Sequence, residues 1–60
     1  MTLHFIGGRT DTLVIDKETK KYLVVHTENG AHLHYRINKE TGEVQDNAYH
    51  SVIKGLYITD

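Results

Sequence analysis

Three of the five histidines in this chain of 60 residues surround one short turn-forming segment. The segment reads His26-Thr27-Glu28-Asn29-Gly30-Ala31-His32-Leu33-His34. Neutral imidazoles bind zinc, with Zn–N bonds of about 2.0–2.1 Å. His32 and His34 share one face of an extended strand and lie roughly 7 Å apart. With a third ligand they would hold a metal ion, although the same spacing is also typical of plain surface imidazoles.

Whether His26 joins this pair depends on the register of the hairpin at Asn29-Gly30. A two-residue loop pairs Glu28 with Ala31 and separates His26 from the other two imidazoles. A three-residue loop, with Gly30 in the left-handed bulge position, instead places His26 opposite His32. Because a slip of one residue turns every side chain to the opposite face, the neighbouring turns must agree with the choice.

The neighbouring turns favour the two-residue loop. Four-residue loops at 17–20 and 39–42 pair Ile15 with Tyr22 and Ile37 with Val44. Combined with the two-residue loop, they collect one apolar face, made of Leu13, Ile15, Tyr22, Val24, Leu33, Tyr35, Ile37 and Val44. The three-residue loop would force Lys21 into this core. We therefore predict that His26 stays apart from His32 and His34.

The chain is expected to form a single small β-rich domain over residues 1–60. Short β-branched and aromatic runs alternate with turn segments. We predict a mainly β fold: a small antiparallel meander of four to five strands, closed as an SH3-like barrel or left open, with one short C-terminal helix or 3₁₀ turn. The helix would begin at Asp46 or Asn47 and run through Lys54. In the alternative, 51–53 is a further strand.

Composition limits the class of protein. Seven basic and eight acidic side chains give a net charge of −1, which argues against strong nonspecific nucleic-acid binding. No cysteine is present, so a core this small needs well-matched strands, a metal or a partner chain. No apolar run approaches the roughly 20 residues of a membrane span, and the first ten residues do not resemble a signal peptide. We expect an intracellular, cytoplasmic protein.

Catalysis is not expected. Ser51 is the only serine, and on a strand its side chain would point away from that of its neighbour His50. A nucleophile and its base need hydrogen-bond reach and a third, orienting group. No glycine-rich phosphate-binding motif is present. We predict a protein that is not an enzyme and needs no cofactor.

The leading functional prediction is a small protein-binding regulatory module: an adaptor, inhibitor or regulator that binds another protein and self-associates. It would use an open edge strand or a mixed sheet face, formed by Leu23, Val25, His32, His34 and Arg36. The first alternative is a nucleic-acid-binding β-module whose phosphate contacts are Lys17, Lys20, Lys21 and Arg36. The second alternative is a histidine metal-binding protein using His32 and His34.

Overall fold

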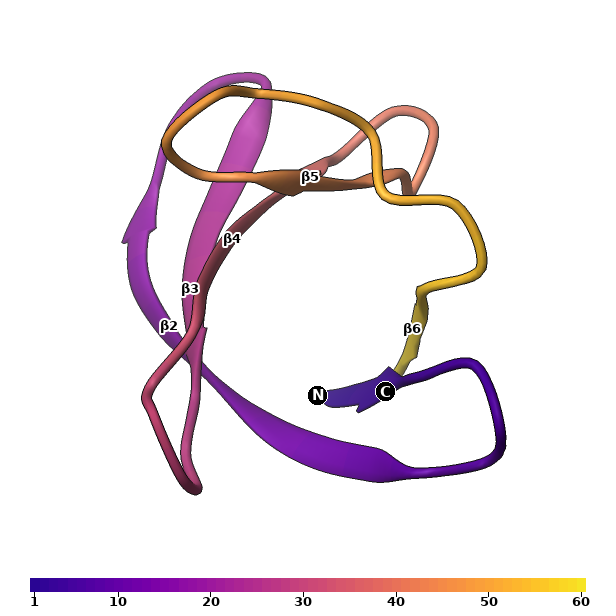
Figure 1. Cartoon of the computed structure of the whole chain (residues 1–60). Coiled ribbons are helices and arrows are strands. Elements are labelled where there is room, and N and C mark those ends of the chain that lie inside the picture. Colours follow the sequence, from indigo (N-terminus) through magenta and orange to yellow (C-terminus); the bar gives the residue numbers. More distant parts are fainter.

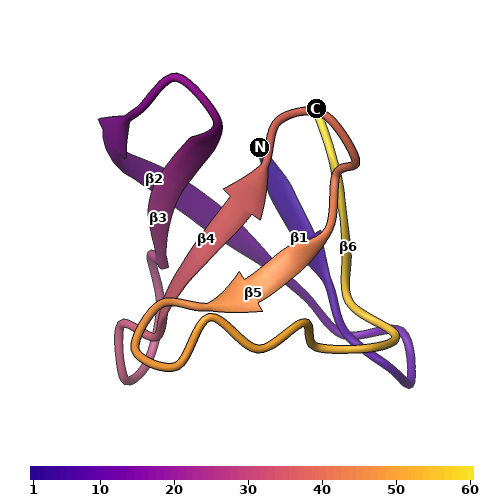
Figure 2. The same cartoon turned by 90° about the horizontal axis from the view of Figure 1, so that it is seen from above.

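The computed structural model describes residues 1–60 and consists of strands and turns without a helix. The strands are β1 (Thr2–His4), β2 (Thr10–Glu18), β3 (Tyr22–Thr27), β4 (His34–Asn38), β5 (Val44–Asp46) and β6 (Tyr57–Thr59). They form one antiparallel sheet in the order β5-β4-β3-β2-β1-β6. The sheet curls into a half-barrel, and the segment after β5 crosses to β6 (Figures 1 and 2).

The prediction of a mainly β, antiparallel fold is confirmed, but the sheet has six strands where four to five were expected. The two ends of the chain pair with each other. Leu3 of β1 lies opposite Ile58 of β6, and β1 also pairs with β2. No helix in the structure has the length and apolar character needed to cross a lipid bilayer.

The predicted C-terminal helix is absent. Asp46 does accept a hydrogen bond from the Tyr49 backbone N–H at 2.7 Å, as a helix-capping residue would. The chain makes only one turn, because His50 adopts a left-handed conformation with φ of 61°. It then runs back along β5, where the Ile53 N–H donates to the Val44 carbonyl. Residues 51–53 are therefore close to the strand alternative, joined to β5 by a single β-bridge.

The core lies inside the curve of the sheet, on what we call the inner face. Its buried apolar residues are Leu3, Leu13, Val25, Tyr35, Ile37 and Val44. Only 8 of the 60 residues are buried, so the apolar area that stabilises the fold is small. The residues on the opposite side of β2, β3 and β4 form the outer face.

The predicted register of β3 and β4 is wrong. Val25, not Val24, is fully buried, and it lies opposite Tyr35. The connecting loop, 28–32, is longer than either loop considered from the sequence. Thr27 determines this length, because its backbone N–H donates to the Leu33 carbonyl and its hydroxyl accepts from the Leu33 N–H. Ile15 and Leu33, both expected in the core, are 51% and 47% exposed.

The predicted loop at 17–20 is also wrong, because β2 continues to Glu18. A β-bulge between Ile15 and Lys17 inserts Asp16 as an additional residue in the strand. The turn follows at Thr19, whose backbone and hydroxyl both bond to Tyr22. A bulge changes which side chains face the core on either side of it, so a register counted from the turn alone fails here.

The turn at 39–42 agrees with its prediction. Ile37 pairs with Val44. The Asn38 carboxamide oxygen accepts hydrogen bonds from the backbone N–H groups of Glu40 and Thr41 at 2.8 and 3.1 Å. Gly42 closes the turn with φ of 79°, a conformation that favours glycine.

Candidate metal centre

Three strands bring Asp16, His26 and His34 together on the outer face. His26 on β3 lies directly opposite His34 on β4, and directly paired residues of antiparallel strands point to the same face. Asp16 reaches them from β2, because it occupies the bulge next to the strand pair. The bulge and the loop 28–32 are thus the two features that assemble the cluster.

The Asp16 carboxylate bonds tightly to His26. The two carboxylate oxygens lie 2.7 and 2.8 Å from His26 Nδ1. An ionised carboxylate only accepts hydrogen bonds, so Nδ1 carries the proton and donates it. The nearest nitrogen of His34, its Nδ1, lies 3.9 Å from the carboxylate. His26 is the most enclosed of the three, with 22% of its side chain exposed against 36% for Asp16 and 58% for His34.

These distances are close to those of a metal centre. One ligand atom from each residue lies within 4.8 Å of the other two. Around a tetrahedral zinc ion with bonds of 2.0–2.1 Å, ligand atoms are about 3.3 Å apart. Moving from the observed spacing to that spacing requires shifts of roughly 1 Å, which side-chain rotation supplies without a change in the strands. A metal bound at His26 Nδ1 would replace the proton there.

His32 lies against the same cluster, although its ligand atoms are outside the group defined by Asp16, His26 and His34. Its ring is stacked on that of His26 at a centroid distance of 5.7 Å and an angle of 17°. The ring of His34 lies 5.6 Å from that of His26. The predicted separation of His26 from His32 and His34 is therefore wrong, for the register reason given above.

The five residues predicted for partner binding do not share a surface. Val25 is buried in the core, and Leu23 packs against the core cluster on the inner face. His34 and Arg36 lie on the outer face, where Arg36 Cζ sits 3.9 Å above the Tyr22 ring and Arg36 Nε donates to the Gln45 side-chain oxygen at 2.7 Å. The mixed apolar and basic face expected from the sequence is not formed, because Val25 points inward.

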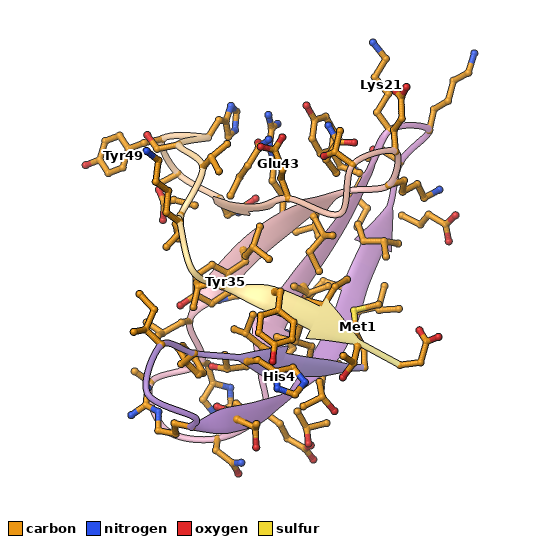
Figure 3. The ribbon with its side chains drawn as sticks, turned by 90° about the vertical axis from the view of Figure 1, so that its right-hand side faces the viewer. Met1, His4, Lys21, Tyr35, Glu43 and Tyr49 are labelled. Carbon is orange, nitrogen blue, oxygen red and sulfur yellow. The ribbon has the colours of Figure 1, made fainter.

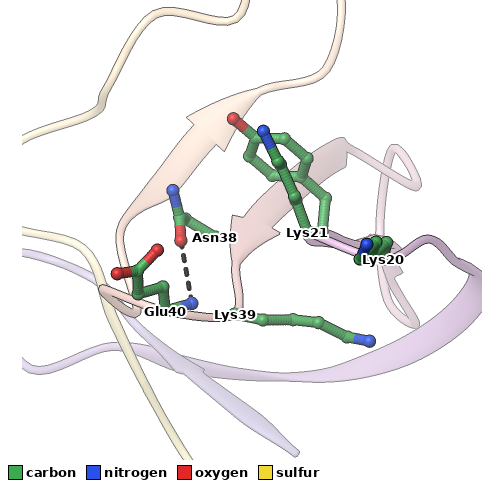
Figure 4. A pocket seen from close by; sticks show the side chains of 6 residues that line it. Lys20, Lys21, Asn38, Lys39 and Glu40 are labelled. Carbon is green, nitrogen blue, oxygen red and sulfur yellow. Dashed lines mark hydrogen bonds between the residues drawn. The ribbon is translucent and has the colours of Figure 1, made fainter.

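The lysines predicted for nucleic-acid binding are only partly brought together. Lys20 and Lys21 line a pocket of about 410 Å³ with Lys39, between the β2–β3 and β4–β5 turns (Figure 4). Lys39 is itself paired with Glu18. Lys17 and Arg36 are not among the pocket residues. Figure 3 shows Lys21 at the same end of the molecule as Glu43, so the end is of mixed charge.

Sequence reasoning missed Asp16 and Lys39 as members of these clusters. The position of Lys39 near Lys20 and Lys21 could have been predicted from the topology, because alternate turns of an antiparallel meander lie at the same end of the sheet. Asp16 gave no such signal: in a segment rich in charged and turn-forming residues, a bulge is indistinguishable from a loop.

Comparisons of this chain with protein-family models, with curated proteins and with solved structures find no match. The class is therefore defined by the fold and the site alone: a small antiparallel half-barrel with a histidine–aspartate cluster on its outer face.

Proposed function

We propose that this protein binds a divalent transition-metal ion, with zinc as the best-suited ion, through Asp16, His26 and His34. The observation that carries the proposal is the convergence of one carboxylate and two imidazoles from three strands, with ligand atoms within 4.8 Å. Imidazole nitrogen suits Zn²⁺, Cu²⁺, Fe²⁺ and Ni²⁺, and zinc also accepts carboxylate oxygen.

Binding would connect β2, β3 and β4 through one ion. A domain of this size gains little from its core alone, and a structural metal is one of the usual means of stabilising such a chain. We therefore propose a stabilising or regulatory role for the metal and no catalytic one.

Isothermal titration calorimetry of untagged protein with zinc chloride tests the proposal. We expect one zinc per chain for the natural sequence. His26→Asn and His34→Asn should each weaken binding at least about tenfold, which corresponds to about 1.4 kcal/mol. His50→Asn is the matched control, because His50 lies in the turn after β5 and belongs to no ligand cluster. Absence of zinc binding, or unchanged affinity in His26→Asn, would contradict the proposal.

Self-association through an edge strand is our second proposal. It is favoured by the exposure of β6, where Tyr57 is 56% exposed. The Tyr57 ring stacks on the His4 ring with a centroid distance of 4.5 Å. An edge strand has unpaired backbone groups that a second copy of the chain can pair with. Nucleic-acid binding through Lys17, Lys20, Lys21 and Arg36 remains a prediction.

Light scattering over a dilution series tests self-association. The natural chain should form dimers at high concentration, and Tyr57→Lys should shift the equilibrium to monomer. Tyr49→Lys is the control, because Tyr49 is 86% exposed and projects away from the body of the molecule (Figure 3). A natural chain that stays monomeric at every concentration would rule this proposal out.

A further inference from the structure

We infer that His32 is the fourth ligand of the metal centre, which makes the site a closed tetrahedral one. This inference rests on the proposed function and specifies the coordination of the same site. Structural zinc sites have four protein ligands, whereas three protein ligands leave a position open to water. A closed site at Asp16, His26 and His34 therefore needs one further ligand from this chain.

Ring spacing favours His32. Two imidazoles bound to one tetrahedral zinc ion have their centroids about 5 Å apart, given Zn–N bonds of 2.0–2.1 Å. His34 and His32 lie at 5.6 and 5.7 Å from His26, so both are close to this value. The His32 ring is nearly parallel to that of His26, at 17°. It must therefore turn about its side-chain bonds so that a nitrogen faces the ion.

The loop that carries His32 is anchored at both ends. Thr27 is 1% exposed and holds Leu33 through two hydrogen bonds. The Asn29 side chain donates to the Asp11 carboxylate at 3.0 Å, and the Glu28 N–H donates to the Thr12 carbonyl. The backbone therefore holds His32 beside the cluster, and only the side chain has to rotate.

The backbone of His32 supports the same conclusion. Its φ of 52° places a residue with a side chain in the left-handed region, where such residues are uncommon and cost free energy. Glycine would adopt this conformation without the cost. Backbone strain of this kind concentrates at functional sites, and here it holds an imidazole against a metal-binding pair.

Cobalt substitution tests whether His32 is the fourth ligand. Tetrahedral Co²⁺ absorbs visible light much more strongly than six-coordinate Co²⁺. The natural chain should give the intense spectrum. His32→Asn should shift the bands of this spectrum, because water would replace an imidazole as the fourth ligand, and should bind zinc at least about tenfold more weakly, since losing even a hydrogen-bonding partner of a ligand costs about 10–100-fold in affinity. Asparagine tolerates the left-handed conformation, and His32→Gly provides a second variant without side-chain strain.

His50→Asn is the matched control, because His50 also has a positive φ, 61°, but lies outside the cluster. It should leave both the spectrum and the affinity unchanged. If both His32 variants keep the band positions of the natural chain's cobalt spectrum and the natural zinc affinity, His32 is not a ligand. If His26→Asn also leaves zinc affinity unchanged, the proposed metal site itself fails, so the two failures are distinguishable.

Discussion

His26 and His34 lie directly opposite each other on β3 and β4, with ring centroids 5.6 Å apart and planes at 45°. Their proximity is therefore a property of the sheet register and not of a flexible loop. The Asp16 carboxylate reaches this pair only because β2 carries a bulge at that point. The centre thus depends on the backbone arrangement of three strands.

The position of the carboxylate can be tested by moving it. Val14 lies directly opposite His26 and is 38% exposed. Asp16→Ala should lose zinc affinity at least about tenfold. The double variant Val14→Asp, Asp16→Ala should recover part of it, because opposite residues have Cβ atoms about 4.5–5.5 Å apart. Calorimetry measures both, and Val14→Asn, Asp16→Ala is the uncharged control. If the two double variants bind zinc with the same reduced affinity, a carboxylate opposite His26 does not contribute to the site.

The register of β3 can be tested with two adjacent valines. Val25→Ala removes two methyl groups from a fully buried position and should lower the free energy of unfolding by about 2 kcal/mol. Val24→Ala, on the half-buried outer face, should cost less than about 1 kcal/mol. Urea denaturation followed by circular dichroism measures both. A larger loss for Val24→Ala would support the register in which Val24 faces the core.

The β-rich, antiparallel character of the fold was predictable because it depends on local composition. Runs such as Tyr22–Val25 are β-branched and aromatic, and segments such as Asn38–Gly42 have turn chemistry that acts within a few residues. The 39–42 loop was predicted with its pairing, because the Asn38 side chain and the Gly42 conformation both operate locally.

The candidate site was not predictable by the same reasoning. The register of β3 and β4 depends on Thr27, whose hydrogen bonds extend the loop beyond the length that Asn29-Gly30 suggests. A register argument that extends through several hairpins also fails at a single bulge, because the bulge reverses the inward and outward positions that follow it. Because the bulge at Asp16 was not recognised, the face of the sheet predicted for His26 was wrong as well.

The helix prediction failed for a related reason. Asp46 accepts a hydrogen bond from the third residue after it, as in a helix cap, but the same bond also closes a single turn. Whether the chain continues as a helix depends on non-local partners. Here the Val44 carbonyl pairs with Ile53 N–H, and this pairing directs the segment back along β5.

Alkaline pH should destabilise the fold through Tyr35. Burial raises the pKa of the Tyr35 phenol above its ordinary value of 10.0; the positive charge of Arg9 partly offsets this, and the negative charges of Asp46 and Asp11 add to it. The unfolded chain therefore loses the proton first. Stability is fully present below pH 10.0 and falls as the pH rises above it.

Urea denaturation at several pH values between about 8 and 11 tests this dependence. Tyr35→Phe keeps the buried ring and should reduce the loss of stability at the alkaline end. Tyr49→Phe is the matched control and should leave the loss unchanged, since its ring is 86% exposed in the folded chain. A Tyr35→Phe variant with the natural pH dependence would show that other groups cause the alkaline loss.

Zinc should raise the melting temperature, because it binds the folded chain through three strands that are separated in the unfolded one. Free zinc at 100 times its dissociation constant adds about 2.7 kcal/mol to the free energy of unfolding. For a domain of this size, each kcal/mol shifts the melting temperature by about 4–8 °C, so we expect a rise of at least about 10 °C. Differential scanning calorimetry measures it, and a chelator should reverse it. The rise should shrink in His26→Asn and persist in His50→Asn. An equal rise in both variants would place the stabilising zinc outside this cluster, since His26 belongs to the cluster and His50 does not.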